Sequence, residues 1–184
     1  MRNKQEGFSL VELLVVVAII LIIAVFAIPN LLRSKISANQ ASAVGSLRTI
    51  NTACIAYSTT YSQFPAALGD LGPVASGSGN GNGNGNGNGN GNGNNGNGNG
   101  NGGNGQSSPS STSADLIDAV LASGVKSGYI FSYTAGASNQ SYTVTATPIT
   151  PATSGQNMYF TDQSGVIRQD TSGLGATATS TPIG

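Results

Sequence analysis

The chain has 184 residues, with one cysteine and no histidine, and its seven basic and seven acidic side chains give a formal net charge of zero. A single cysteine excludes an intramolecular disulfide, and the lack of histidine excludes imidazole metal sites and histidine-based catalysis. Charged residues make up only 8% of the chain, so there is no basic surface to neutralise phosphates, and nucleic acid is not an expected partner. We therefore expect neither an enzyme nor a cofactor-binding protein.

Residues 8–28 form an apolar run, FSLVELLVVVAIILIIAVFAI, that follows a short polar stretch containing Arg2 and Lys4. At about 1.5 Å per residue, a helix of this length spans about 30 Å, the thickness of the hydrocarbon core of a bilayer. Basic residues on its amino side predict that this end stays in the cytoplasm and that the chain after Pro29 lies outside.

Three interpretations of this apolar run compete. It is a simple signal anchor, a secretory signal cut after residues 25–27, or a segment that stays on the mature protein after a cut between Gly7 and Phe8. The run is longer than the roughly 7–15 residues usual in a secretory signal. It also contains one charge, Glu12, and a carboxylate in a bilayer costs up to roughly 3 kcal/mol. Both features favour the third interpretation.

Glu12 also has a purely structural explanation. The sequence from Ser9 to Glu12 fits a capping box, in which Ser9 precedes the helix and Glu12 occupies its third position. A carboxylate in the first turn also interacts favourably with the helix dipole. Capping and a functional role for the charge can coexist, and the sequence leaves both open.

The run GFSLVELL, from Gly7 to Leu14, resembles the prepilin signature shared by type IV pilins and the pseudopilins of type II secretion. Pro29 falls where such proteins place a helix-kinking proline. The resemblance implies that residues 1–7 are a leader, that a prepilin peptidase cuts after Gly7, and that the same enzyme methylates the Phe8 amine. It also implies that Glu12 pairs with the Phe8 amine of a neighbouring subunit, which suits a buried carboxylate in need of a cation.

Beyond Pro29, apolar residues recur every three, four or seven positions and form one stripe. Its members are Leu32, Ile36, Ala43, Leu47, Ile50, Cys54, Tyr57, Tyr61 and Phe64. This spacing predicts one long helix over about residues 9–62, kinked or locally opened at Pro29. Its first half, residues 8–28, has no partner in its own domain and needs lipid or neighbouring subunits. Its amphipathic second half, residues 29–64, is expected to pack on the rest of the chain, with Cys54 as a small buried apolar residue.

A Gly-Asn repeat fills most of residues 77–106 and offers no apolar side chain to bury. We expect it to be a flexible exposed loop within a connector of residues 65–112. Residues 113–124 are expected to form a short helix capped by Ser113. Four strand-like runs follow, separated by turn-prone residues. They are Tyr129–Thr134, Tyr142–Thr147, Met158–Thr161 and Val166–Gln169.

These elements predict an α+β, type IV pilin-like fold, in which a small antiparallel sheet of about four strands packs on the second half of the long helix. The short helix, the sheet and a tail expected to be loop from Thr171 make up residues 113–184. Asp162 and Asp170 lie in this part, and some major pseudopilins bind calcium in a late loop. The resemblance therefore makes both residues metal candidates, although their spacing fits no EF-hand. A solvated surface role is the competing interpretation, and we expect no metal.

The chain is thus expected to be a structural subunit that polymerises through its apolar helix into an extracellular or cell-surface filament. Its expected partners are other copies of itself, the prepilin peptidase and methyltransferase, inner-membrane assembly machinery and, before assembly, membrane lipid. We expect a single-pass precursor in the bacterial inner membrane, with its amino end in the cytoplasm. Two alternatives stay open: a pseudopilin of a type II secretion system, and a secreted binding module or adhesin with an ordinary signal sequence.

Overall fold

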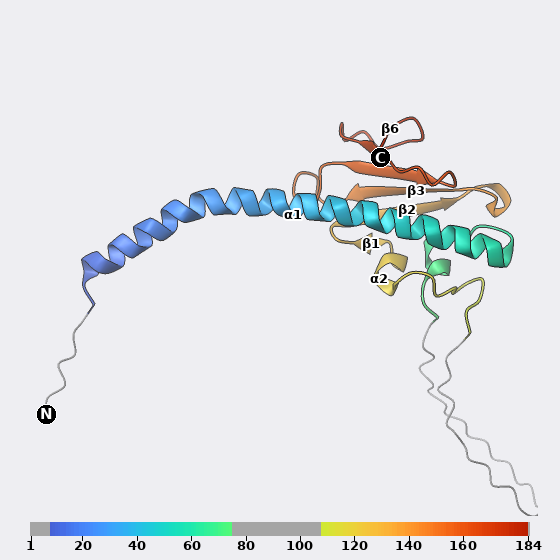
Figure 1. Cartoon of the computed structure of the whole chain (residues 1–184), viewed down its shortest axis with the longest axis horizontal. Helices are drawn as coiled ribbons and strands as arrows, with labels where there is room; N and C mark the ends of the chain where they lie inside the picture. Colours follow the sequence, from blue (N-terminus) through green and yellow to red (C-terminus); the bar gives the residue numbers. More distant parts are fainter. Residues whose placement is uncertain (1–7, 75–107, 184) are drawn as a thin grey trace, which may run out of the picture.

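The computed structural model describes residues 8–74 and 108–183, so the predicted leader, residues 1–7, and the Gly-Asn repeat lie outside the described residues. One long helix, α1 (Leu10–Tyr61), extends along the molecule, and a sheet packs against its carboxyl-terminal half (Figure 1). The other half projects from the sheet as a curved, isolated helix (Figure 1). The predicted α+β class and helix bounds of about 9–62 are confirmed.

The ends of α1 follow local backbone chemistry. Ser9 precedes the helix with an extended backbone (φ −73°, ψ 137°), as an N-cap residue does. Ser62 ends it in the left-handed region, with φ 60°, and its N–H donates to the Ser58 carbonyl at 2.9 Å. The helix is continuous through Pro29. Because proline has no N–H, the carbonyl four residues earlier lacks its usual donor, which favours bending in this half.

The predicted apolar stripe is buried where α1 meets the sheet. Its buried members are Ile36, Ala43, Leu47, Ile50, Cys54 and Tyr57. Leu32 lies before the sheet begins and is 43% exposed, whereas Tyr61 and Phe64 are partly buried against the core. The ring centroids of Tyr57 and Tyr61 are 4.5 Å apart, and Phe64 lies edge-on to Tyr142 at 4.9 Å. These aromatic side chains therefore pack the end of α1 onto the sheet.

The predicted short helix over residues 113–124 is mostly wrong. Only α2 (Ala119–Ala122) is helical, and its cap is Asp118, whose Oδ1 accepts from the Leu121 N–H at 2.9 Å. Ser113 instead forms a β-bridge with Ser110. The four residues after Ser113 donate their backbone N–H groups to carbonyls in and just after the 3₁₀ helix η1 (Leu68–Leu71). Because these N–H groups bond to another segment, they are not available for the hydrogen bonds of a helix.

The sheet has six strands in an antiparallel meander, with each strand beside the next in the sequence. They are β1 (Val125–Lys126), β2 (Tyr129–Ala135), β3 (Tyr142–Pro148), β4 (Met158–Asp162), β5 (Arg168–Asp170) and β6 (Thr181–Pro182). The four predicted strands correspond to β2–β5, with β5 beginning two residues later than expected. The prediction misses β1 and β6, which have two residues each and are too short to show an alternating pattern. β6 lies in the tail that was expected to be loop.

A buried polar contact joins α1 to the sheet. The Asn51 Nδ2 donates to Thr161 Oγ1 at 2.8 Å, and the Tyr142 hydroxyl donates to Asn51 Oδ1 at 3.1 Å. Asn51 and Thr161 are buried polar residues, and Tyr142 is 1% exposed. Because all three side chains have partners, the contact holds the helix in one register on the sheet without an unpaired polar group.

Candidate functional site

The amino-terminal half of α1 presents an apolar surface to solvent. Every large apolar side chain from Phe8 to Leu32 is exposed, by 43% at Leu32 up to 78% at Phe8. Among the described residues, α1 is the one helix long and apolar enough to cross a membrane, and none of its most apolar window is buried. A signal sequence near an amino terminus shares these properties. Exposed apolar area costs about 25 cal/mol per Å², so this half needs a cover of lipid or protein.

Glu12 lies in the first turn of this exposed half. Over residues 8–74 it forms no ion pair, and it lies in an apolar hollow beside Val11, Val15 and Val16. The Ser9 side chain makes no capping hydrogen bond, so the capping box that the sequence suggested is not formed. Capping hydrogen bonds therefore give no account of Glu12, which keeps its position in the first turn of the helix. Within the described residues its charge has no ion-pair partner.

The other predicted positions in this region are placed as follows. Phe8 is exposed one turn before Glu12, and Pro29 lies inside α1 near the end of the exposed half. Gly7 lies outside the described residues. Phe8 and Glu12 thus lie at the amino-terminal end of the exposed half, and Pro29 lies near its other end.

The structure does not bring the two metal candidates together. Asp162 ends β4, whereas Asp170 pairs with Met158 at the other end of that strand. Asp162 Oδ1 accepts from the N–H and hydroxyl of Ser164 at 2.9 and 2.5 Å. Each carboxylate therefore holds its own loop. Over residues 8–74 and 108–183, no group of three or more His, Cys, Asp or Glu side chains is placed to bind a metal.

Asp170 illustrates this loop-holding role. Its carboxylate accepts four hydrogen bonds from Ser172, Leu174 and Gly175, at 2.7–3.1 Å. The hydroxyl of Ser172, followed by these backbone N–H groups, lowers the pKa of the Asp170 carboxyl. The bonds stabilise the ionised form, so the charge is already satisfied by its own loop.

Cys54 is fully buried, as predicted. Burial raises the pKa of its thiol to about 12, so the group is neutral near neutral pH. A neutral buried thiol is a poor nucleophile and a poor metal ligand. Cys54 is therefore part of the packing between α1 and the sheet.

Asn51 joins α1 to the sheet, and the spacing of apolar residues in the sequence did not identify it. It follows Ile50 on the buried side of α1, and its partners Thr161 and Tyr142 lie about a hundred residues further along the chain. A polar residue beside an apolar stripe was the available signal, but nothing local to it indicates those partners.

Comparison with known proteins supports the sequence interpretation. Residues 2–28 match the family model described as the prokaryotic N-terminal methylation motif. The chain is similar to type II secretion system core protein G of Vibrio cholerae, with 42% identity over 63 residues, 34% of this chain and 43% of the relative. No solved structure matches the chain significantly.

Two further relatives carry the same name. The protein of Dickeya chrysanthemi is 31% identical over 72 residues, which cover 39% of this chain and 47% of the relative. That of Aeromonas hydrophila is 33% identical over 64 residues, 35% of this chain and 45% of the relative. The chain thus spans less than half the length of the curated relatives it matches. The methylation motif, these relatives and the long helix packed on an antiparallel sheet support a relationship of this chain to the type IV pilin and pseudopilin family.

Proposed function

We propose that this chain is a structural subunit that polymerises into a filament through the exposed half of α1. The observation that carries the proposal is the apolar surface from Phe8 to Leu32, joined without a break to a helix that is embedded in a folded domain. A lone copy leaves this surface uncovered. Side-by-side packing of α1 helices from many copies buries it and leaves the sheet domains outside, where their polar surfaces meet water.

The motif supports a pathway to that filament. Residues 1–7 are a leader, a prepilin peptidase cuts between Gly7 and Phe8, and the same enzyme methylates the new amine of Phe8. Before the cut, residues 8–28 anchor the chain in the inner membrane as a single pass with its amino end in the cytoplasm. Inner-membrane machinery then moves the processed chain from lipid into the filament, outside the cell.

Glu12 has a role in this assembly. A methylated amine keeps its positive charge, and a carboxylate moved into an apolar filament core needs a cation beside it. We assign the Phe8 amine of a neighbouring copy as that cation. Its support is that Glu12 lines an apolar hollow, has no ion-pair partner among the described residues and makes no capping hydrogen bond with Ser9.

Mass spectrometry of filaments sheared from cells tests this function. We expect this chain in the filaments, with a mature amino terminus at Phe8 that carries one methyl group. A mature amino terminus at Ile28 would instead support the alternative of a secreted binding module or adhesin. That result would overturn the filament function, because the apolar helix would be lost before export.

The second candidate is a pseudopilin of a type II secretion system. The observation that favours it is the similarity to three proteins named type II secretion system core protein G. Deleting the gene separates the two functions. Loss of secreted proteins from the medium favours the pseudopilin, and loss of long surface fibres with normal secretion favours the pilus subunit. We propose no catalytic activity for either.

A further inference from the structure

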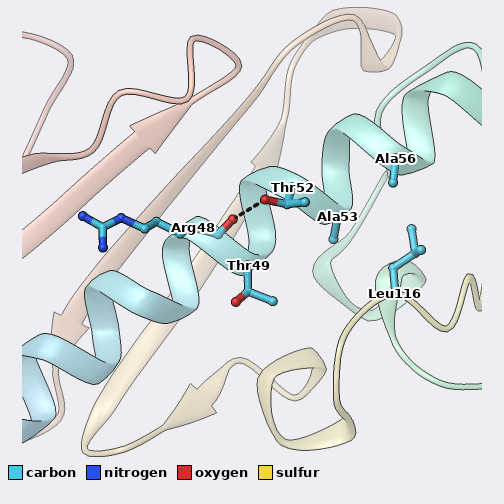
Figure 2. Close-up of a pocket in the computed structure, with 6 residues that line it drawn as sticks. All are labelled: Arg48, Thr49, Thr52, Ala53, Ala56 and Leu116. Carbon is cyan, nitrogen blue, oxygen red and sulfur yellow. Dashed lines mark hydrogen bonds between the residues drawn. The ribbon is translucent and has the colours of Figure 1, made fainter.

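A shallow groove on the domain lies between α1 and the chain that follows the connector. It has a volume of about 360 Å³ and is lined by Arg48, Thr49, Thr52, Ala53, Ala56 and Leu116. Ala53, Ala56 and Leu116 point toward one another, whereas Arg48 lies at the amino-terminal end of the groove and points away (Figure 2).

The groove is more apolar than its threonines suggest. The Thr49 hydroxyl donates to the Gly45 carbonyl at 3.1 Å, and the Thr52 hydroxyl donates to the Arg48 carbonyl at 3.0 Å (Figure 2). Because both hydroxyls are occupied on the helix backbone, the threonine methyl groups are left to line the groove. An apolar side chain can fill such a site without leaving a polar group unpaired.

Two acidic residues lie on the segments next to Leu116, outside the lining of the groove itself. Asp115 directly precedes Leu116 and is exposed, and its N–H donates to the Gly72 carbonyl at 2.8 Å. The Ala114 N–H donates to the Asp70 carbonyl at 2.8 Å. Asp70 and Asp115 therefore lie on segments that are joined by backbone hydrogen bonds. Arg48 therefore lines one end of the groove, and the segments that carry Asp115 and Asp70 lie next to Leu116, which lines the other part.

A matching surface lies elsewhere on the same chain. Ile28, Leu31, Leu32 and Lys35 follow helical spacing and share one face of α1. The three apolar side chains are 68%, 72% and 43% exposed, and Lys35 is exposed too. Over the described ranges the one ion pair joins Lys126 to Asp118, so Lys35 has no acidic partner there. From its amino-terminal end to its carboxyl-terminal end, this stripe is first apolar and then basic.

We propose that the stripe from Ile28 to Lys35 of one copy docks in the Arg48–Leu116 groove of a second copy, with Lys35 beside Asp115 and Asp70. The two sites cannot meet within one chain, because about 20 residues of continuous helix hold them roughly 30 Å apart. Residues 75–107 have no side chain larger than alanine that is apolar, so that segment cannot fill the groove equally well. A second copy is the occupant that supplies both the apolar side chains and the charge.

The charges also select an orientation. Parallel helices bring Lys35 to the Leu116 end of the groove, whereas antiparallel helices bring it to Arg48, where like charges repel. In the parallel arrangement the second copy is displaced along the helix by about 21 residues, roughly 30 Å. The two contact surfaces differ, so the contact is heterologous and repeats without closing, as a filament requires. The inference rests on the proposed function and adds the offset along the helix axis between neighbouring copies.

Cysteine cross-linking in sheared filaments tests the contact. We expect Leu32→Cys with Leu116→Cys to give disulfide-linked multimers, because the two α-carbons must come within about 7 Å to be bridged. The matched control is Ser34→Cys with Leu116→Cys, which places the thiol on the opposite side of α1, about 200° around the helix from Leu32. Each single-cysteine variant shows whether filaments still form after the substitution. It also shows whether Cys54 contributes to the cross-links. Equal cross-linking in both pairs, or none from Leu32→Cys, overturns the proposal and points to another cover for the groove.

A charge exchange tests the same contact without thiols. Lys35→Asp is expected to lower filament yield about tenfold, and adding Asp115→Lys is expected to restore most of it. Arg33→Gln and Lys35→Gln remove the same charge, and only Lys35→Gln should reduce the yield. A lack of rescue together with equal effects of the two glutamine variants contradicts the docking. Wild-type cells that make no filaments contradict the proposed function instead, so the two failures are distinguishable.

Discussion

The two halves of α1 belong to one continuous helix and have opposite surroundings. From Phe8 to Leu32 every large apolar side chain is exposed, whereas Leu47, Ile50 and Cys54 in the second half are fully buried. The second half finds its partner in the sheet of its own chain. The first half has more apolar side chains than the second and, within the described residues, no partner in its own chain (Figure 1).

This difference shows that burial depends on what faces a helix as well as on its sequence. A helix that is apolar all round needs apolar surroundings on every side, which a single small sheet cannot provide. The second half is apolar on one side, and one sheet is sufficient for it. The contrast predicts that substitutions in the first half change assembly and that substitutions in the second half change the stability of the domain.

Replacing Glu12 with glutamine should give the largest effect, the loss of filaments. The substitution removes the charge that is proposed to pair with the Phe8 amine but keeps a side chain able to cap the helix. Filament yield after shearing measures it, with Ser9→Ala as a control that removes the other member of the capping box. Normal filaments from Glu12→Gln would contradict the pairing role. Equal losses of filaments in Glu12→Gln and Ser9→Ala would support capping as the role of both residues.

The same substitution in the two halves should separate their roles. Leu47 is fully buried, so Leu47→Ala is expected to lower the free energy of unfolding of the domain by about 3 kcal/mol. Leu21 is 61% exposed, so Leu21→Ala should leave that free energy nearly unchanged and reduce filament yield. Urea unfolding of the purified chain in detergent, followed by tyrosine fluorescence, measures both. Similar destabilisation by the two variants would show that the first half also packs within the chain.

Asn51→Ala should cost about 2 kcal/mol, because it leaves the buried hydroxyls of Tyr142 and Thr161 without their partner. Ser42→Ala is the matched control. It removes an exposed hydrogen bond of 2.9 Å from α1 to Ser127, so only a small loss is expected. The same urea titrations measure both variants. A loss no larger for Asn51→Ala than for Ser42→Ala would mean that the buried contact adds nothing to stability.

The stability of the domain should fall by about 1.4 kcal/mol between pH 7 and pH 10 because of Cys54. The thiol has a pKa of about 12 in the folded chain and an ordinary value of 9.0. Between these values the unfolded chain has released the proton and the folded chain has kept it, so this contribution is complete below pH 9 and declines above it. Urea titrations at pH 7, 9 and 10 check the decline.

Cys54→Ala is the control for this decline and should remove most of it at pH 9. Burial also raises the pKa of five tyrosines, so they add to the decline at pH 10 and above. They are Tyr57, Tyr129, Tyr133, Tyr142 and Tyr159. A decline of equal size in the wild-type chain and in Cys54→Ala below pH 10 would assign it to other groups.

Much of the helix and little of the sheet edge was predictable from the sequence. The stripe from Ile36 to Tyr57 predicted both the helix and its buried face, because helix bonds and helix faces repeat every three to four residues. Ser113 was a plausible cap by the same local logic. It failed because the four residues after it bind the backbone around η1 through bonds that no local pattern reveals.

The candidate site divides in the same way. Its apolar length, its lone Glu12 and its prepilin-type motif are properties of consecutive residues, so the sequence by itself determined them. The separation of Asp162 from Asp170 by the length of a strand, the partners of Asn51 and the groove beside Leu116 depend on residues that are distant in the chain. Only the tertiary structure decided these, because antiparallel pairing and packing select their partners across the fold.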